Sequence, residues 1–331
     1  MTTRVLVTGA GGPSAVAFMQ AVRGYDVDLF AADIDPYAAG LHLVMPDRRS
    51  IVCRGDDPRF TDHLLDECRA RNIDVLVPTV DAELLPVAAR RVCFEESGIR
   101  VLAASACALA KCIDKWSLVR ACADVCPTPK TALLDRAFDP RGWTFPAVVK
   151  PRRGAGGRGV VLVRTARMLS QFPRDESMII QEYLPGAEFS VDVLSDTRGI
   201  VRAAVPRVRL KVDSGIAVAG RTVRDATLQA AAGMVAQRLG LTFVANVQFK
   251  RDAAGVPKLL EVNARFPGSM PLTVAAGVNM PRLALDLVRG RALPPNVGEF
   301  AEVGLVRTWA DHVIRSGAFT DLEQRALALQ G

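Results

Sequence analysis

Short apolar runs alternate with amphipathic stretches over the first third of the chain. The stretches between the runs, such as Arg59–Arg71 and Ala82–Ser97, carry apolar positions at helical spacing, and the runs themselves are RVLVTG, VDLFAADI, RSIVCR, DVLVPTV and RVLAAS. Strands and helices that alternate in steps of about 20 to 30 residues are typical of a doubly wound parallel sheet. The pattern therefore predicts a Rossmann-like unit over residues 1–104.

The pattern changes after residue 104. A helix is expected over CALAKCIDKWSLVRACADV, and Pro127 and Pro129 end it. Apolar runs then come in neighbouring pairs: FPAVVKPR with GVVLVRT, EFSVDVLS with GIVRAAVPRVRL, and FVANVQFK with PKLLEVNAR. Short connections such as DTRG and DAAG predict antiparallel hairpins. The fold class is therefore expected to be α/β followed by α+β.

Composition and charge narrow the class of partner. The chain has 331 residues, of which 50% are hydrophobic and 23% charged, enough for two or three folding units with a core. The net charge is +7, but Lys and Arg are spread along the chain and aromatic residues make up only 6%, which disfavours nucleic acid. The longest uncharged run, Val5–Val22, is broken by GAGGPS, so no membrane span is expected. A polyanionic small molecule suits the excess of positive charge.

The cysteines and the N-terminal residues predict a cytoplasmic protein. Seven Cys lie between Cys53 and Cys126 with no CxxC pair, and three scattered His do not complete a zinc pattern. Reduced cysteines are the expected state for such a set. The first residues, MTTR, lead straight into a strand without the features of a signal sequence.

The glycine turn in VLVTGAGGPSAV raises the question of a nicotinamide-dependent oxidoreductase. Asp33 and Asp35 close the next apolar run, near the spacing of a ribose-binding carboxylate. Ser14, however, stands where the dinucleotide fingerprint has its third glycine, which disfavours that reading. Because a helix N-terminus binds anions, we hypothesise that Gly11–Ser14 holds a substrate carboxylate. The alternative is that the glycines only shape the turn.

A second glycine-rich segment predicts a phosphate site. In FPAVVKPRRGAGGRGVVLV, Lys150 ends one buried strand, and a loop containing Gly156 and Gly157 precedes the next strand. Glycines allow backbone N–H groups to approach a phosphate chain, and the lysine adds positive charge beside it. The spacing differs from GxxxxGK[ST], so this is not a Walker-type loop. A glycine hairpin with a surface lysine is the structural alternative.

The segment IIQEYLPGAEFSVDVL offers groups for a nucleoside. The backbone of Glu182, Tyr183 and Leu184 can face a flat heterocycle, and Glu188, beyond the PG turn, can accept from ribose hydroxyls. Taken alone, an exposed acid on a turn explains Glu188 better. The nucleoside interpretation therefore depends on the neighbouring motifs.

The segment NVQFKRDAAGVPKLLEVNARFPG is a predicted hairpin with an oxygen-rich end. Glu261 and Asn263 share one face of a strand, and Gln248 on the partner strand is expected close to them. Mg²⁺ prefers oxygen ligands, with one or two carboxylates alongside phosphate and water. Arg265, two positions further along the same face, would place a guanidinium beside the same phosphates. We therefore expect a magnesium site here.

Together these motifs resemble the ATP-grasp superfamily. They are DK at Asp114–Lys115, VVKPRRGAGGRGV, QEYLPGAEFSVDV and LLEVNARFPGS, in that order. Gln248 followed by EVNAR is most similar to the carbamoyl-phosphate-synthetase-type branch, which includes stand-alone amino-acid ligases. The resemblance implies a Rossmann-like pre-ATP-grasp domain at 1–104, a small lobe at 105–180 and a C-terminal lobe at 181–331, with ATP between two antiparallel sheets.

The resemblance also implies roles for individual residues. Arg265 would stabilise the transferring phosphoryl group and the tetrahedral oxyanion. Lys211, with Arg207 and Arg209, lies in PRVRLKVDSGIAVAG, which is similar to a loop that closes over the triphosphate and contacts the γ-phosphate or the acceptor. The remaining implied contacts are with phosphates (Lys115, Lys150, Gly156, Gly157), adenine (Glu182, Tyr183, Leu184), ribose (Glu188), and two Mg²⁺ ions, which Mn²⁺ can replace (Gln248, Glu261, Asn263).

The function that the resemblance implies is an ATP- and Mg²⁺-dependent ligase. It would activate a small-molecule carboxylate as an acyl-phosphate and join it to an amine, with release of ADP and phosphate, and a homodimer would be ordinary for the family. Two alternatives stay open: phosphorylation of bicarbonate or carbamate, as in carbamoyl phosphate synthetase, and a non-catalytic ATP-binding regulatory protein. The nicotinamide oxidoreductase is the third and the least favoured.

Overall fold

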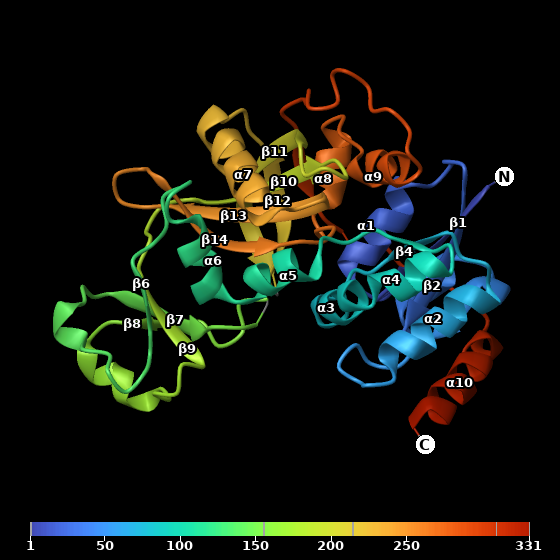
Figure 1. The fold of residues 1–331 in the computed structure, drawn as a ribbon, viewed down its shortest axis with the longest axis horizontal. Helices are drawn as coiled ribbons and strands as arrows, with labels where there is room; N and C mark the ends of the chain where they lie inside the picture. Colours follow the sequence, from blue (N-terminus) through green and yellow to red (C-terminus); the bar gives the residue numbers. More distant parts are fainter. Residues whose placement is uncertain (1, 155, 214, 309, 331) are drawn as a thin grey trace.

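A computed structural model describes residues 2–154, 156–213, 215–308 and 310–330, and within these residues the strands form three sheets (Figure 1). The first sheet is parallel, with the order β3-β2-β1-β4-β5. Its strands are β1 (Thr3–Thr8), β2 (Val27–Asp33), β3 (Arg49–Ile51), β4 (Val75–Val77) and β5 (Arg100–Val101). The helices between them are α1 (Pro13–Ala21), α2 (Phe60–Ala70), α3 (Asp81–Ala89) and α4 (Arg91–Glu96), with 3₁₀ turns at Ala39–Leu43 and Pro46–Arg48.

Two short helices follow the parallel sheet where one long helix was predicted. These are α5 (Ala106–Ile113) and α6 (Lys115–Cys122). The break lies at Asp114, whose carboxylate accepts hydrogen bonds from the backbone N–H groups of Trp116 and Ser117 and so caps α6. The single-helix prediction was wrong at this point because an Asp that caps a new helix also ends the preceding one.

The small lobe contains an antiparallel sheet with the order β6-β9-β7-β8, at the left of Figure 1. A separate apolar core that includes Leu134, Val149 and Ile180 holds it together. Its strands are β6 (Thr131–Leu133), β7 (Ala147–Pro151), β8 (Val161–Val163) and β9 (Met178–Glu182), with 3₁₀ turns at Pro140–Gly142 and Ala166–Gln171.

The third sheet is antiparallel at every pair of neighbouring strands and has the order β14-β13-β10-β11-β12-β15. Its strands are β10 (Glu188–Ser195), β11 (Val201–Asp213), β12 (Ile216–Thr222), β13 (Phe243–Arg251), β14 (Pro257–Asn263) and β15 (Gly304–Val306). The accompanying helices are α7 (Ala226–Leu239), α8 (Met270–Ala275), α9 (Met280–Val288) and α10 (Thr320–Gln330), with a 3₁₀ turn at Ser316–Ala318.

Period-two alternation gives the third sheet two different faces. Val191, Val247 and Phe249 are buried against the apolar side of α7, which supplies Leu228 and Val235 to the same core. The opposite face has two parts. At one end Leu194, Val205 and Val244 enter the core shared with α1. At the other end the positions are polar or charged (Glu188, Asp192, Arg209, Asn246, Gln248, Glu261 and Asn263). This polar face is the surface on which the candidate site is built.

The end of the chain returns to the parallel sheet. α10 lies beside the N-terminal unit (Figure 1) and contacts β3, and its Leu322 and Ala326 enter the same core as α1, α8 and α9. That core also contains Phe266, which follows β14, so it joins the first sheet to the end of the third. The N-terminal unit is thus packed against the segment that leaves the site.

The predicted fold class is confirmed, since a parallel sheet precedes two antiparallel sheets and all three predicted hairpins are present. PRVRLKVDSGIAVAG is a hairpin of β11 and β12, which corrects its interpretation as a loop. The proposed domain boundaries stay predictions. In the part of the chain that the structure describes, no helix is both long and apolar enough to cross a membrane, and the seven cysteines form no disulfide.

Candidate functional site

A chain of hydrogen bonds runs along the polar face of the third sheet. Asn246 Nδ2 donates to Asp192 Oδ1 at 2.7 Å, and Gln248 Nε2 donates to Asn246 Oδ1 at 3.3 Å. Arg209 Nη1 then donates to Gln248 Oε1 at 3.1 Å and also pairs with Glu188. These side chains lie at registered positions of three neighbouring strands, which fixes their order across the face.

Lys150, at the end of β7, faces this surface from the small lobe. Its side chain is buried, with 7% exposure, and burial lowers the pKa of its ammonium to about 8, although the charge of Glu261 opposes that shift. Lys115 and Glu188 are also close enough to influence the pKa of Lys150. A buried cation is unfavourable without an anionic partner, so this lysine is suited to an anionic ligand.

Lys115, the first residue of α6, is the second buried lysine of the site, with 8% exposure. Burial lowers the pKa of its ammonium, against the opposing charges of Glu261, Asp81 and Asp114. Its Nζ donates to the carbonyl of Gly154 at 2.6 Å, at the start of the glycine-rich loop. The two predicted lysines therefore come together from different elements, and the charge of Glu261 acts on the pKa of both.

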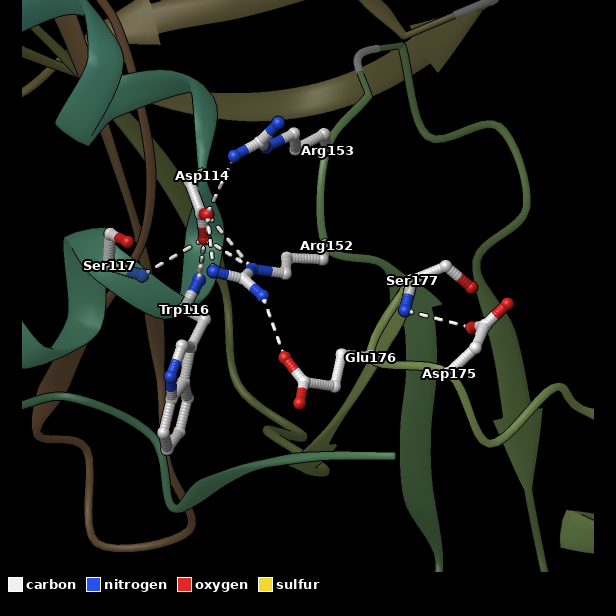
Figure 2. A network of polar contacts seen from close by, with 8 residues as sticks. All are labelled: Asp114, Trp116, Ser117, Arg152, Arg153, Asp175, Glu176 and Ser177. Carbon is white, nitrogen blue, oxygen red and sulfur yellow. Dashed lines mark hydrogen bonds and ion pairs between the residues drawn. The ribbon is translucent and has the colours of Figure 1, made fainter. Parts of the chain in front are cut away.

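Asp114 anchors the glycine-rich loop to α6, as Figure 2 shows. Its carboxylate accepts from Arg152 at 2.8 Å and lies 3.5 Å from the Arg153 guanidinium, while Arg152 also reaches Glu176 at 3.5 Å. Burial raises the pKa of Asp114, but the hydrogen bond from Arg152 and the Ser117 N–H outweigh burial and hold the pKa below its ordinary value. The carboxylate stays charged and fixes Lys115 beside the loop.

The glycine-rich loop has a backbone that only glycine adopts readily. Gly156 and Gly157 both have φ of 70°, and Gly159 has φ of 72°. A Cβ at Gly215, in the tip of the β11–β12 hairpin, would lie 3.1 Å from the Cα of Gly156. The loop of the small lobe therefore touches the hairpin of the other lobe. Residue 155 lies outside the described residues.

The predicted metal ligands lie on one face at the end of the β13–β14 hairpin. Gln248 pairs directly with Glu261, and Asn246 pairs with Asn263, so the expected juxtaposition is present. Asn263 Nδ2 donates to Glu261 Oε1 at 3.1 Å. Of the three predicted ligands, Glu261 is the one carboxylate, and the amides of Gln248 and Asn263 lie beside it. Among the described residues no group of three His, Cys, Asp or Glu side chains could hold a metal. Such a set fits Mg²⁺ only with phosphate and water as further ligands.

The predicted nucleoside contacts lie where β9 runs into β10. Lys258 of β14 pairs with the Glu182 carboxylate, and Lys250 Nζ lies 5.9 Å from the centroid of the exposed Tyr183 ring. Leu184 is buried, while Glu188 is half-buried and paired with Arg209. The structure brings these residues to the border of the same polar face, but their contacts with adenine and ribose stay predictions.

The three basic residues of β11 that were predicted to contact phosphate or acceptor divide into two groups. Arg207 is 1% exposed, and its Nη2 donates to Asp192 at 2.6 Å, which gives it a partner inside the protein. Arg209 belongs to the polar face, and Lys211 is exposed near the hairpin tip. Arg207 therefore links β11 to Asp192 of β10 inside the protein. The catalytic role of Lys211 stays a prediction.

Arg265 lies beyond the end of β14, not on the strand itself. Its guanidinium pairs with Asp81, at 2.6 Å from Nε to Oδ1 and 3.1 Å from Nη2 to Oδ2. Asp81 opens α3 in the N-terminal unit and was not among the predicted site residues. The available signal was an acid directly after the strand–turn segment VLVPTV, where the carboxyl end of a parallel strand meets a helix start.

In the β1–α1 turn, a backbone N–H group already has a carboxylate of the protein as its hydrogen-bond partner. Gly11 N–H donates to Asp33 Oδ2 at 2.7 Å, and Gly12 N–H donates to the carbonyl of Gly9 at 2.8 Å. The acid that suggested a ribose contact therefore caps the glycine turn. This geometry favours the view that Gly11 and Gly12 shape the turn over the hypothesis that they hold a substrate carboxylate.

The arrangement of a parallel sheet followed by two antiparallel lobes, with buried lysines and a glycine-rich loop between the lobes, defines an ATP-grasp protein. Two family models match the chain: "PylC-like, N-terminal domain" over residues 5–102 and "ATP-grasp in the biosynthetic pathway with Ter operon" over residues 174–309. Together the two matched segments place the chain in the ATP-grasp superfamily, and it is similar to the carbamoyl-phosphate-synthetase-like branch.

A curated relative and two solved structures agree with this placement. The arginine-specific carbamoyl phosphate synthase large chain of Bacillus subtilis is 26% identical over 264 residues, which cover 72% of this chain and 25% of that protein. The chain thus spans about a quarter of that relative's length. Biotin carboxylase of Campylobacter jejuni has a TM-score of 0.73 at 15% identity, covering 90% of this chain and 73% of the other. The L-amino acid ligase of Bacillus licheniformis has a TM-score of 0.68 at 15% identity, covering 87% of this chain and 74% of the other. The two structures establish similarity of fold.

Proposed function

We propose that the protein is an ATP- and Mg²⁺-dependent ligase that joins a carboxylate to an amine. In the first step a carboxylate oxygen attacks the γ-phosphorus of ATP, ADP leaves, and an acyl-phosphate forms. In the second step an amine nitrogen attacks the acyl carbon, the C–O bond to phosphate breaks, and the nitrogen loses a proton as the amide forms. The products are an amide, ADP and phosphate.

The observation that carries this proposal is the convergence of two buried lysines on one carboxylate. Lys115 and Lys150 come from different elements, and the charge of Glu261 influences the pKa of both ammonium groups. The glycine-rich loop, bonded to Lys115 through Gly154, lies directly beside them. Two cations, a loop rich in N–H groups and an oxygen-donor set at one place suit a triphosphate.

Each residue has a part in this proposal. Lys115 and Lys150 hold the phosphate chain, and the backbone at Gly156 and Gly157 lets N–H groups approach it. The strand end Glu182–Leu184 faces adenine, and Glu188 accepts from ribose once Arg209 releases it. Arg265 stabilises the transferring phosphoryl group and the oxyanion, and Lys211 reaches the γ-phosphate from the hairpin.

Gln248, Glu261 and Asn263 are the residues that would hold magnesium, as two ions or one, with Mn²⁺ as a substitute. Bound there, the ion would neutralise charge on the β- and γ-phosphates. Glu261 provides the only carboxylate of this set, and Asn263 orients it through the 3.1 Å hydrogen bond. The protein's own contribution is thus to fix one anionic oxygen opposite two lysines.

The nature of the relatives supports an amide ligase, with one specific rival. The L-amino acid ligase structure covers 87% of this chain, which supports amino acids as the carboxylate and the amine. The carbamoyl phosphate synthase relative covers 72% of it, which keeps phosphorylation of bicarbonate or carbamate as the second candidate. We also propose small-molecule partners alone, a cytoplasmic location and a homodimer.

Release of ADP tests the proposal directly. The purified protein should be incubated with Mg²⁺·ATP and pairs of amino acids, with ADP measured by a coupled assay and the products of active pairs identified by mass spectrometry. The expected result is ADP formation that requires both partners, with an amide product that contains both. ADP formation that depends on bicarbonate alone would support the rival activity. No ADP with any acceptor, together with tight ATP binding, would support the regulatory alternative.

The loop Arg153–Arg158 should become more protected from hydrogen exchange when nucleotide binds. Residue 155 within it lies outside the described residues, while Gly156 and Gly157 have a backbone whose N–H groups gain partners only when phosphate oxygens arrive. Hydrogen-exchange mass spectrometry with and without Mg²⁺·ATP measures this, and α2 serves as the internal control. Equal protection of the loop in both states would contradict its assignment to the triphosphate.

A further inference from the structure

The strand order of the parallel sheet reverses between β1 and β4. The order is β3-β2-β1-β4-β5, and such a reversal is where open α/β sheets bind their ligands. The loops after the two strands are in contact, since Thr79 Oγ1 donates to the carbonyl of Thr8 at 2.8 Å. Helices α1 and α3 begin at this place. The Arg265 side chain reaches this place, since its guanidinium contacts Asp81 of α3 and Ser14 of α1.

The hydrogen bonds of Arg265 differ between the two edges of its guanidinium. Nε and Nη2 donate to the two oxygens of Asp81, at 2.6 and 3.1 Å. Nη1 lies 3.4 Å from both Ser14 Oγ and the carbonyl of Phe266, which is long for an N–H···O bond. The bidentate pair with Asp81 therefore fixes one edge, and the Nη1 side has only weak contacts to give up.

The backbone around Arg265 is fixed by the same N-terminal unit. Phe266 is 2% exposed, and its ring centroid lies 4.9 Å from that of Phe18 on α1 in an edge-on contact. At Gly268 a Cβ would come within 3.0 Å of the Pro13 ring, so the segment lies close against the start of α1. The position of the Arg265 Cα is therefore set by packing, and the direction of its guanidinium is set by Asp81.

The Asp81 carboxylate interacts with a second cation besides Arg265. The Asp81 carboxylate also lies close enough to Lys115 to raise the pKa of that ammonium against the effect of burial. Asp81 thus interacts both with Lys115 and with Arg265, which follows β14. Asp81 has 38% of its side chain exposed and Arg265 19%, so the pair borders the site and is not buried in the core.

We propose that Asp81 is a positioning residue, which holds the Nε–Nη2 edge of Arg265 so that Nη1 faces the reacting phosphoryl and acyl oxygens. Open α/β sheets bind ligands at this switch point, and here the N-terminal unit instead completes the catalytic site through Asp81. This inference rests on the proposed function, because it assigns Arg265 to the ligase reaction. A guanidinium fixed in direction before reaction stabilises developing charge without further reorganisation.

The test compares Asp81→Asn with Asp62→Asn, which removes the charge of an exposed acid in the same unit that pairs with Arg90 at 2.6 Å. We expect Asp81→Asn to lower kcat for ADP formation about 10-fold to 100-fold, with the Kd for Mg²⁺·ATP within about threefold of wild type. Asp62→Asn should leave both unchanged. An unaltered kcat in Asp81→Asn would overturn the proposal.

A double-mutant cycle separates positioning from a general structural effect. If Asp81 acts through Arg265, Asp81→Asn combined with Arg265→Lys should be no slower than Arg265→Lys alone. Losses that multiply in the double variant would overturn the proposal. Thermal unfolding of all variants controls for loss of the fold.

The contact itself can be measured without substrates. Phenylglyoxal modification of Arg265, followed by peptide mass spectrometry, should be at least about 10-fold faster in Asp81→Asn than in wild type or Asp62→Asn, because the bidentate pair protects the guanidinium. Equal rates would overturn the positioning role. Protection of Arg265 together with no ADP formation by wild type would instead reject the proposed function and, with it, the catalytic purpose of the contact.

Discussion

Lys150→Ala is expected to abolish turnover and to weaken ATP binding. Lys150 is 7% exposed at the end of β7, beside the glycine-rich loop, and the charge of Glu261 acts on its ammonium group. Loss of a charge-assisted phosphate contact in a site closed to water costs about 1.5–3 kcal/mol in binding, or about 10-fold to 100-fold in Kd. The rate should fall by at least about 100-fold, since charge on the phosphates changes most in the transition state.

Calorimetry with Mg²⁺·ATP and the ADP assay measure the two effects. Lys130→Ala is the matched control, because Lys130 lies in the same lobe, is exposed and donates to the carbonyl of Gly142. A Lys150→Ala protein with the affinity and rate of wild type would show that the phosphates bind elsewhere.

The same lysine predicts how ATP affinity changes with pH. Burial lowers the pKa of Lys150 to about 8, from its ordinary value near 10.5. Only the charged ammonium favours phosphate, so the Kd for ATP should be constant below that pKa and should rise about tenfold per pH unit above it. Lys150→Ala should lose the part of this dependence that begins near pH 8. An affinity of the wild type that does not change between pH 7 and pH 10 would contradict the assignment.

Glu261→Gln is expected to slow the reaction far more than it weakens nucleotide binding. Glu261 is the only carboxylate of the proposed metal set, and its charge opposes the effect of burial on both Lys115 and Lys150. Removal of one such charge could cost on the order of 3 kcal/mol at the transition state, or about 100-fold in rate, while ground-state affinity falls less. The contacts proposed for adenine and ribose lie at Glu182–Leu184 and Glu188, so they are unaffected.

Three measurements check Glu261→Gln: kcat for ADP formation, the Kd for ATP and the Mg²⁺ concentration that gives half-maximal binding of ATP. The last should rise in Glu261→Gln, and it is read without turnover. Glu96→Gln, an exposed glutamate on α4, is the control for removal of one negative charge. Wild-type values in all three measurements would remove Glu261 from the metal set.

Much of the fold could be predicted because its signals are local. Alternation of short strands and helices predicted the parallel unit, and glycine or aspartate turns between apolar runs predicted the three hairpins. The break at Asp114 escaped prediction, since an Asp inside an apolar helical pattern caps a new helix only if its carboxylate turns back to Trp116 and Ser117. The ion pair between Arg152 and Asp114 holds the carboxylate in this orientation.

The sequence by itself determined the chemical inventory of this protein: a lysine before a glycine-rich loop, and Glu261 with Asn263 two positions apart on one strand. Such patterns depend on strand period and residue type, which neighbouring residues decide. Only the tertiary structure decided which groups meet. It brought Lys115 and Lys150 close enough to Glu261 for that charge to act on both, and it placed Asp81 on Arg265 across 184 residues of chain. Contacts of that kind depend on how sheets pack against one another, and no local pattern in a single sequence contains that information.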